Sequence, residues 1–375
     1  MAKTKIPVCI LGPGAAGQEF MEAIPENHPD FEIAEIRGHS TAGKLLGDLG
    51  ESLIINVSDR LKNMRIKPMP NSVEDLNPGI GMYCSALGGD KATMKYIEGL
   101  CASQKPTYST TAAWRYEPDI GIFIPEASPI RTYALIKEQQ KNRGWKGFEC
   151  PGSNCTVMGP IIALKALGFN QQRDIIDPLV FNDAESIDLS SYQAISGAGR
   201  DAVVEWQRQR KTGELVGEDK KQFDRNVIPK IDGEMEKVKK EIRKILDAPN
   251  LKINGEYIRV AVEYGHTVSM FVRTKEGYDI SKIPERVEIF NNQCKKDFGD
   301  LFSAPEKTVE LSGEYGPQPL RDVEKYGGMC TFIGQIRPLD GEKGLVCVVL
   351  SNNLKKGAAK EQVYLAEYMH RERFF

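Results

Sequence analysis

The chain has little net charge, because 50 Lys and Arg residues nearly balance 52 Asp and Glu residues. A pI near 6.2 argues against a general nucleic-acid binder, which would carry a basic surface. The sequence also lacks an apolar run of the roughly 20 residues that cross a bilayer. Its first residues lead directly into a strand-like segment and lack a secretory signal pattern. We therefore expect a soluble, cytoplasmic protein that binds neither nucleic acid nor membranes.

Metal-binding patterns are missing as well. The eight cysteines form no CxxC pair, and none lies near a histidine at zinc-ligand spacing. In a chain of 375 residues without a secretory signal, a reducing compartment is expected, where disulfides are rare. We expect no metal site. Histidine is scarce, with four residues at positions 28, 39, 266 and 370.

The N-terminal part follows a β–glycine turn–α–β pattern. Ile6–Leu11 is apolar like a buried parallel strand, a glycine-rich turn follows, and 15–24 has helical spacing. Phe31–Ile36 predicts the second strand. Together these segments predict the start of a doubly wound α/β sheet, within a chain long enough for two domains. Further strands are expected at 81–85 and 120–124, with a helix at 92–104.

The glycine turn predicts a dinucleotide site. Gly12, Gly14 and Gly17 let the backbone approach a pyrophosphate, and the helix start at Ala15 and Ala16 supplies N–H donors. An ordinary tight turn is the alternative.

Residues after the second strand bear on the choice of cofactor. The segment contains basic and hydroxyl side chains that suit a 2′-phosphate, namely Arg37, Ser40, Thr41 and Lys44. NADP is therefore preferred, although Glu35 keeps NAD open.

After Thr156 the pattern changes to longer strands with fewer glycine turns. A helix is expected at 157–167, where Pro160 would have to lie in the first turn, and a charged amphipathic helix at 232–246. A closing helix is expected at 358–370. Strand-like runs occupy 175–195, 258–272, 307–311, 329–337 and 345–350. These features predict a second, mixed α+β domain.

A thiol, an amide and an imidazole are the candidate chemical groups. Cys155 follows the small-residue loop Pro151-Gly-Ser-Asn and precedes an apolar helix, whose N-terminus would stabilise a thiolate. Gln193 precedes the glycine-containing turn that ends at Gly199. His266 is the candidate acid/base by elimination among four histidines. A buried structural cysteine and a structural histidine are the alternatives.

Ordered motifs along nearly the whole chain resemble a known family. They are the glycine turn, Ser40–Lys44, Ala112–Asp119, Ile124–Glu126, Ser153–Cys155, Gln193–Gly199, Ser303–Pro305, Pro317–Pro319 and Ser351–Ala359. In these the chain resembles the aspartate-semialdehyde dehydrogenases, specifically the branch found in archaea and fungi.

The resemblance implies a Rossmann dinucleotide-binding domain over 1–154, completed by a C-terminal helix at about 352–375. It also implies an α+β catalytic and dimerisation domain of the glyceraldehyde-3-phosphate dehydrogenase type over 155–351. The implied activity is the NADP-dependent interconversion of L-4-aspartyl phosphate and L-aspartate 4-semialdehyde, in lysine, threonine and methionine biosynthesis. Family members are usually dimers or tetramers.

The resemblance also implies individual roles. Cys155 would be the nucleophile, His266 the acid/base catalyst, and Gln193 would orient the thioester. Arg259 would bind the substrate α-carboxylate and Glu234 its amine. Phosphate would be held by Lys237, Arg115 and Asn154. The cofactor would also be contacted by Ser85, Leu87, Ser196, Gly197 and Asn353.

These roles have plain alternatives, since Arg115 could be structural and Arg259, in a strand, could face solvent. Glu234 and Lys237 are three residues apart on a charged helix and could form a surface pair. In one uninterrupted strand, Arg259 and His266 would face opposite sides, so a bend is needed between them.

The chain departs from the family in three places. Its glycine turn is one residue shorter, its loop reads Pro-Gly-Ser-Asn before the cysteine, and the segment after Gly199 differs from the usual Tyr-Pro-Gly. These departures keep two alternatives open. One is a CoA-acylating reductase of the same superfamily, acting on malonyl-CoA or succinyl-CoA. The other is a non-catalytic relative that only binds a nucleotide.

Overall fold

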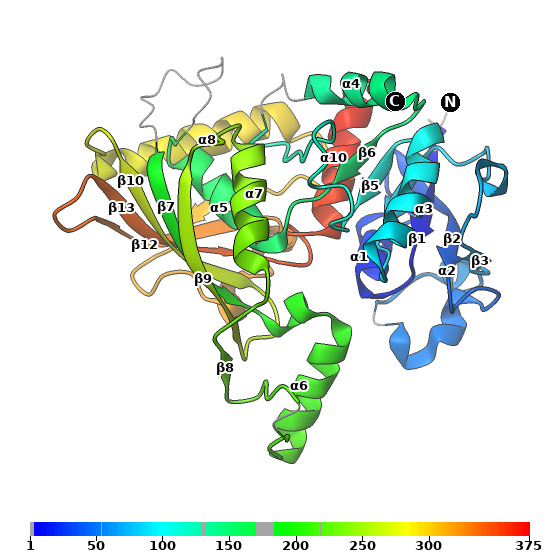
Figure 1. The fold of residues 1–375 in the computed structure, drawn as a ribbon, viewed down its shortest axis with the longest axis horizontal. Helices are drawn as coiled ribbons and strands as arrows, with labels where there is room; N and C mark the ends of the chain where they lie inside the picture. Colours follow the sequence, from blue (N-terminus) through cyan, green and yellow to red (C-terminus); the bar gives the residue numbers. More distant parts are fainter. Residues whose placement is uncertain (1–3, 54, 129–132, 170–183, 218–219) are drawn as a thin grey trace. The chain divides into compact units, whose positions relative to one another are not determined.

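The computed structural model describes residues 4–53, 55–128, 133–169, 184–217 and 220–375, and the chain divides into two compact units (Figure 1). Unit 1 comprises Met1–Ser153, Leu301–Ala304 and Ala358–Phe375. Unit 2 comprises Asn154–Asp300 and Pro305–Gly357. Among the described residues, no helix combines the length and apolarity needed to span a membrane.

Unit 1 is built on a parallel six-stranded sheet in the order β3-β2-β1-β4-β5-β6. Its strands are β1 (Ile6–Leu11), β2 (Phe31–Gly38), β3 (Lys67–Pro68), β4 (Met82–Ser85), β5 (Thr107–Ser109) and β6 (Glu149–Pro151). The strand order reverses at β1, which has β2 on one side and β4 on the other. In such sheets a ligand crevice lies beyond the carboxyl ends of the strands at this reversal.

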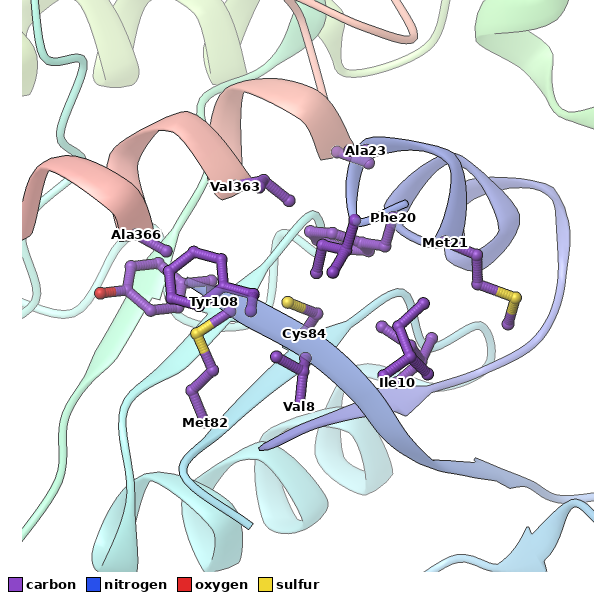
Figure 2. Close-up of a cluster of buried hydrophobic side chains, with 14 of the residues drawn as sticks. Val8, Ile10, Phe20, Met21, Ala23, Met82, Cys84, Tyr108, Val363 and Ala366 are labelled. Atoms are coloured by element: carbon purple, nitrogen blue, oxygen red, sulfur yellow. The ribbon is translucent and has the colours of Figure 1, made fainter. Parts of the chain in front are cut away.

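Helices cover both faces of this sheet. They are α1 (Ala15–Ala23), α2 (Asp59–Lys62), α3 (Lys91–Gln104), α4 (Ala134–Arg143) and the C-terminal α10 (Ala359–Arg371). Val363 and Ala366 of α10 share one buried cluster with Val8 and Ile10 of β1 and with Phe20 of α1 (Figure 2). The C-terminal helix therefore completes the core of the N-terminal unit.

Unit 2 is built on a mixed seven-stranded sheet in the order β11-β12-β13-β10-β7-β9-β8. Its strands are β7 (Ala184–Gln193), β8 (Val227–Ile228), β9 (Lys252–Val260), β10 (His266–Thr274), β11 (Val309–Leu311), β12 (Thr331–Pro338) and β13 (Gly344–Ser351). Pairs β7–β9 and β11–β12 are parallel, and the other pairs are antiparallel. A parallel sheet in unit 1 and this α+β unit confirm the predicted fold class.

Helices of unit 2 are α5 (Cys155–Ala166), α6 (Arg200–Thr212), α7 (Glu234–Ile245), α8 (Ile283–Phe298) and α9 (Pro319–Asp322). Three of them, α5, α7 and α8, pack against each other or against strands of the sheet, whereas α6 extends away from it (Figure 1). The helix α5 begins two residues earlier than predicted, so Pro160 is its sixth residue and lies beyond the first turn.

Two strand predictions were wrong. The run 258–272 is not one strand, because β9 ends at Val260 and a turn with Gly265 at φ +93° precedes β10. Residues 120–124 are buried but belong to no strand. Their apolar side chains therefore reflect packing in the core and not pairing within the sheet. Of the predicted run 175–195, residues 175–183 lie outside the described part, and β7 covers most of the rest.

Candidate active site and dinucleotide site

The candidate nucleophile lies at the start of a helix in unit 2. Asn154 is the N-cap of α5, and its Oδ1 accepts a hydrogen bond of 2.7 Å from the Thr156 N–H. Cys155 is thus the first helical residue, where the helix dipole stabilises negative charge on sulfur. It is partly exposed, whereas the other seven cysteines are buried and all eight are free thiols. Exposure at a helix N-terminus distinguishes a reactive cysteine from a structural one.

His266 is the first residue of β10 and lies against this sulfur. Its Nε2 is 3.2 Å from Cys155 Sγ, and the ring is buried. The Ala194 N–H donates to Nδ1 at 3.2 Å, which assigns the proton of the neutral ring to Nε2. Burial, with the nearby positive charge of Arg259, lowers the pKa of His266 to about 3. His266 therefore stays neutral near pH 7 and presents a proton to the sulfur.

The turn at Gly265 explains how Arg259 and His266 come together. Strand β7 separates β9 from β10, and Gln193 of β7 is the register partner of Arg259. Arg259 Nη1 donates to the Ala194 carbonyl at 2.7 Å, while the N–H of the same residue bonds His266. Desolvation by burial lowers the pKa of Arg259 from its usual value. Both side chains therefore converge on one residue.

Gly197 leaves the space that these two side chains need. A Cβ at this position would lie 2.7 Å from Arg259 Nη1 and 2.8 Å from His266 Cε1. Asn353 holds the neighbouring backbone, because its Nδ2 donates to Ser196 Oγ at 3.0 Å and its Oδ1 accepts the Gly265 N–H at 2.9 Å. Gly197 thus lies against Arg259 and His266, and Asn353 bonds Ser196 and the backbone of Gly265, the residue before His266.

A buried amide–carboxylate cluster holds the other predicted residues. Glu234 Oε1 accepts from Asn154 Nδ2 at 2.9 Å and from Gln193 Nε2 at 3.2 Å. Gln193 Nε2 also donates to Thr156 Oγ1 at 2.8 Å. Lys237 forms an ion pair of 3.5 Å with Glu234 Oε2, with 45% of its own side chain exposed. Glu234 is therefore buried, and it forms the pair with Lys237 that their spacing of three residues on one helix indicated.

Sequence reasoning missed Glu241. Its Oε2 accepts a hydrogen bond of 2.5 Å from the Asn154 backbone N–H, and the side chain is fully buried. It lies seven residues after Glu234 on α7, which is two helical turns, so both carboxylates share one face. The spacing of seven residues was the one feature of the sequence that indicated a shared face. It was overlooked because a glutamate on a strongly charged helix is usually exposed to solvent.

In unit 1 the glycine turn forms a close backbone packing. Gly12 has φ +90°, and a Cβ there would lie 2.7 Å from the Ala86 carbonyl oxygen. A Cβ on Gly17 would lie 1.7 Å from the Gly12 carbonyl oxygen. Gly14 is the N-cap of α1, so the N–H groups of Ala15 and Ala16 open the helix next to the turn. This backbone fits a pyrophosphate, and the Ser85–Leu87 turn adjoins it.

The charged residues after β2 are largely engaged within unit 1. Arg37 is buried and donates to Glu35 Oε1 at 2.5 Å and to two backbone carbonyls. Glu35 also accepts from Lys67 Nζ at 2.6 Å. Ser40 and Lys44 are exposed in the turn that follows, and Thr41 is half-buried. The acidic residue that would favour NAD is thus tied to two cations.

Arg115 also belongs to unit 1, where it is buried and its Nη2 donates to the Thr110 carbonyl at 2.9 Å. Within the described residues, no group of three or more His, Cys, Asp or Glu side chains is placed to hold a metal ion.

Two family models match the chain. The family model described as semialdehyde dehydrogenase, NAD binding domain matches residues 7–133. The model described as semialdehyde dehydrogenase, dimerisation domain matches residues 176–356.

Individual relatives are similar over nearly their whole length. An aspartate-semialdehyde dehydrogenase from Archaeoglobus fulgidus is 30% identical, over 98% of both chains. A malonyl CoA reductase (NADP) from Metallosphaera sedula is 25% identical, over 97% of this chain and 96% of its own. The crystal structure of aspartate semialdehyde dehydrogenase with NADP from Candida albicans has a TM-score of 0.75 at 22% identity, covering 99% of this chain and all of that one.

Proposed function

Because the chain belongs to the semialdehyde dehydrogenase family, we propose that it reduces L-4-aspartyl phosphate to L-aspartate 4-semialdehyde with NADP as cofactor. The observation that carries the proposal is the 3.2 Å contact between Cys155 Sγ and His266 Nε2 at a helix N-terminus. Arg259 and Glu234, both buried beside this pair, supply a cation and an anion. These are the charges that bind an α-carboxylate and an α-amine.

The reaction proceeds through a thioester. The Cys155 thiolate attacks the acyl carbon, and phosphate leaves with the electron pair of the C–O bond. The nicotinamide cofactor, when bound, would supply a hydride to the thioester carbon. The negatively charged oxygen that forms on this carbon then expels the Cys155 thiolate with the electron pair of the C–S bond, and the aldehyde is released. The His266 Nε2–H donates a hydrogen bond to the departing sulfur and keeps its proton, so the thiolate is stabilised for the next turnover.

The cofactor preference follows from the end of β2. Glu35 is bonded to Arg37 and Lys67, which leaves the turn with Ser40, Thr41 and Lys44 to meet the ribose. Hydroxyl groups and a cation suit a 2′-phosphate, so we propose NADP over NAD.

Replacing Arg259 by lysine is expected to weaken substrate binding. A guanidinium can bind a carboxylate with two parallel hydrogen bonds, and an ammonium cannot. Losing one charge-assisted bond of about 1.5–3 kcal/mol predicts a rise in KM of roughly 10- to 100-fold. Steady-state kinetics with varied aspartate semialdehyde measure this change. A normal KM would remove Arg259 from carboxylate binding.

A CoA-acylating reductase is the second candidate, favoured by the malonyl CoA reductase relative and by α6 in place of the family's usual segment. One assay separates the candidates. The purified protein receives NADP, phosphate and aspartate semialdehyde, and in parallel NADPH with malonyl-CoA or succinyl-CoA. Repeating both with NAD or NADH tests the cofactor, and Cys155→Ala is the blank. Turnover only with CoA thioesters would reject the aspartyl substrate, and no turnover would favour a binding protein.

We further propose that the chain self-associates as a dimer or tetramer through unit 2, which contains the dimerisation domain. Along β10, buried residues alternate with half-buried ones such as Thr267, Ser269 and Phe271. One sheet face therefore remains partly open within the chain. A mass from light scattering measures the number of subunits, and a monomer would contradict this proposal.

A further inference from the structure

The residue before the nucleophile is held at three points. The Asn154 N–H donates to Glu241 Oε2 at 2.5 Å, and Asn154 Nδ2 donates to Glu234 Oε1 at 2.9 Å. Asn154 Oδ1 accepts from the Thr156 N–H at 2.7 Å. Two of the three partners are carboxylates on one face of α7, so this helix fixes both the main chain and the side chain of Asn154.

Glu241 differs from its neighbours on the helix surface. Its side chain is fully buried, whereas Glu236 on the same helix is 68% exposed and lies 3.8 Å from Lys239. A hydrogen bond to a carboxylate is stronger than one to a neutral acceptor, and the short distance agrees with that. The N–H of an N-cap residue has no acceptor within its own helix. Glu241 supplies that acceptor.

We propose that Glu241 is a positioning residue for the Cys155 nucleophile. Glu241 acts through the main chain, because its carboxylate holds the backbone N–H of the residue before Cys155. Holding Asn154 sets where α5 begins, and this places Sγ both at the helix N-terminus and within 3.2 Å of His266. The inference rests on the proposed function in taking Cys155 as the nucleophile.

Three variants test this role. Glu241→Leu removes the acceptor, Glu241→Gln keeps an acceptor oxygen while removing the charge, and Glu236→Leu is the exposed control on the same helix. The first readout is the pH profile of Cys155 alkylation by iodoacetamide, which needs neither substrate nor cofactor. Since the other cysteines are buried, alkylation of the folded protein reports on Cys155. Failure of the proposed reaction would leave this readout intact.

In Glu241→Leu we expect the alkylation midpoint at higher pH than in Glu241→Gln, because the sulfur loses its place beside the helix N-terminus and His266. We also expect kcat to fall about 10- to 100-fold with KM within threefold, and Glu241→Gln to recover most of kcat. An alkylation profile and a kcat like those of wild type in Glu241→Leu, or equal losses of kcat in both variants, would overturn the proposal.

Should Glu241→Leu fail to fold, Glu241→Gln carries the test. A kcat two- to fivefold below wild type in this variant supports the proposal, and an unchanged kcat overturns it.

Discussion

Serine in place of Cys155 is expected to lower kcat by several orders of magnitude. A thiol ionises near pH 8.5, and its thiolate is favoured at a helix N-terminus. A serine hydroxyl remains protonated at this pH. His266 cannot take up the hydroxyl proton, because its Nε2 already carries one when Nδ1 accepts the Ala194 N–H. The structure thus offers the variant no base at the place where a serine would need one.

The measurement is steady-state turnover of aspartate semialdehyde with NADP and phosphate, compared with wild type. Cys294→Ser on α8 is the matched control, since it makes the same change at another free cysteine. NADPH binding and thermal unfolding should remain near wild type in Cys155→Ser, because the glycine turn and the nucleophile lie in different units. Activity within tenfold of wild type would remove Cys155 from the mechanism.

Local patterns were sufficient for the dinucleotide unit. The run Ile6–Leu11 is β1 with the predicted bounds, because a central parallel strand is apolar along its whole length. The glycine turn was recognisable because Gly12 and Gly17 occupy positions where a Cβ would strike the backbone. The contact between Gly17 and Gly12 acts between residues close in sequence, so the chain shows it directly, whereas the contact of Gly12 with Ala86 appears only in the structure.

Other features depended on contacts between distant residues. The run 258–272 has the composition of one strand, and only the turn at Gly265 reverses it into β10 beside β7. One uninterrupted strand would place Arg259 and His266 on opposite faces. Because the chain reverses between them, the two residues lie on different strands and both contact Ala194. Glu241 was missed because its partner, Asn154, lies 87 residues away. Burial of an acidic side chain on a charged helix is set by the tertiary partner, which composition does not specify.

A second buried acidic pair in unit 1 has a different expected effect, on stability. Glu98 of α3 accepts from Ser85 Oγ at 2.7 Å and from Thr111 Oγ1 at 3.0 Å. Glu149 of β6 accepts from Ser109 Oγ at 2.5 Å. Both side chains are fully buried. The two carboxyl groups interact, so ionising one opposes ionisation of the other.

Burial raises the pKa of Glu98 to about 7, although hydrogen bonds from the two hydroxyls and the charge of Arg115 oppose the rise. Burial, with repulsion from Glu98, raises the pKa of Glu149 well above its ordinary value. Cys101 and Cys150 also face this pair. Both carboxyl groups therefore favour their protonated forms in the folded state.

The sign of the stability change follows from these pKa directions. A carboxyl whose folded pKa is raised stabilises the fold fully below its unfolded pKa, near 4.5. That stabilisation is lost as the pH rises through about 7. At about 1.4 kcal/mol per pH unit, Glu98 accounts for a loss of up to roughly 3 kcal/mol. Glu149 adds to the loss in the same direction.

Glu98→Gln is therefore expected to flatten the pH dependence of the free energy of unfolding of unit 1. The amide oxygen still accepts a hydroxyl hydrogen bond, but the side chain no longer ionises. The variant should gain stability relative to wild type as the pH is raised from 5 to 9. Urea unfolding in a Trp206→Phe background isolates unit 1, because Trp114 and Trp145 are then the remaining tryptophans.

Glu138→Gln on α4 is the control, since this glutamate is exposed and its replacement should leave the slope with pH unchanged. Parallel pH profiles for Glu98→Gln and wild type would show that Glu98 ionises normally in the folded protein. If the gain is observed, the buried carboxyl of Glu98 lowers the stability of unit 1 at neutral pH. Glu98 holds the hydroxyl of Ser85, and Ser85 precedes the residue that packs against Gly12. The lower stability would therefore accompany the ordering of the candidate dinucleotide site.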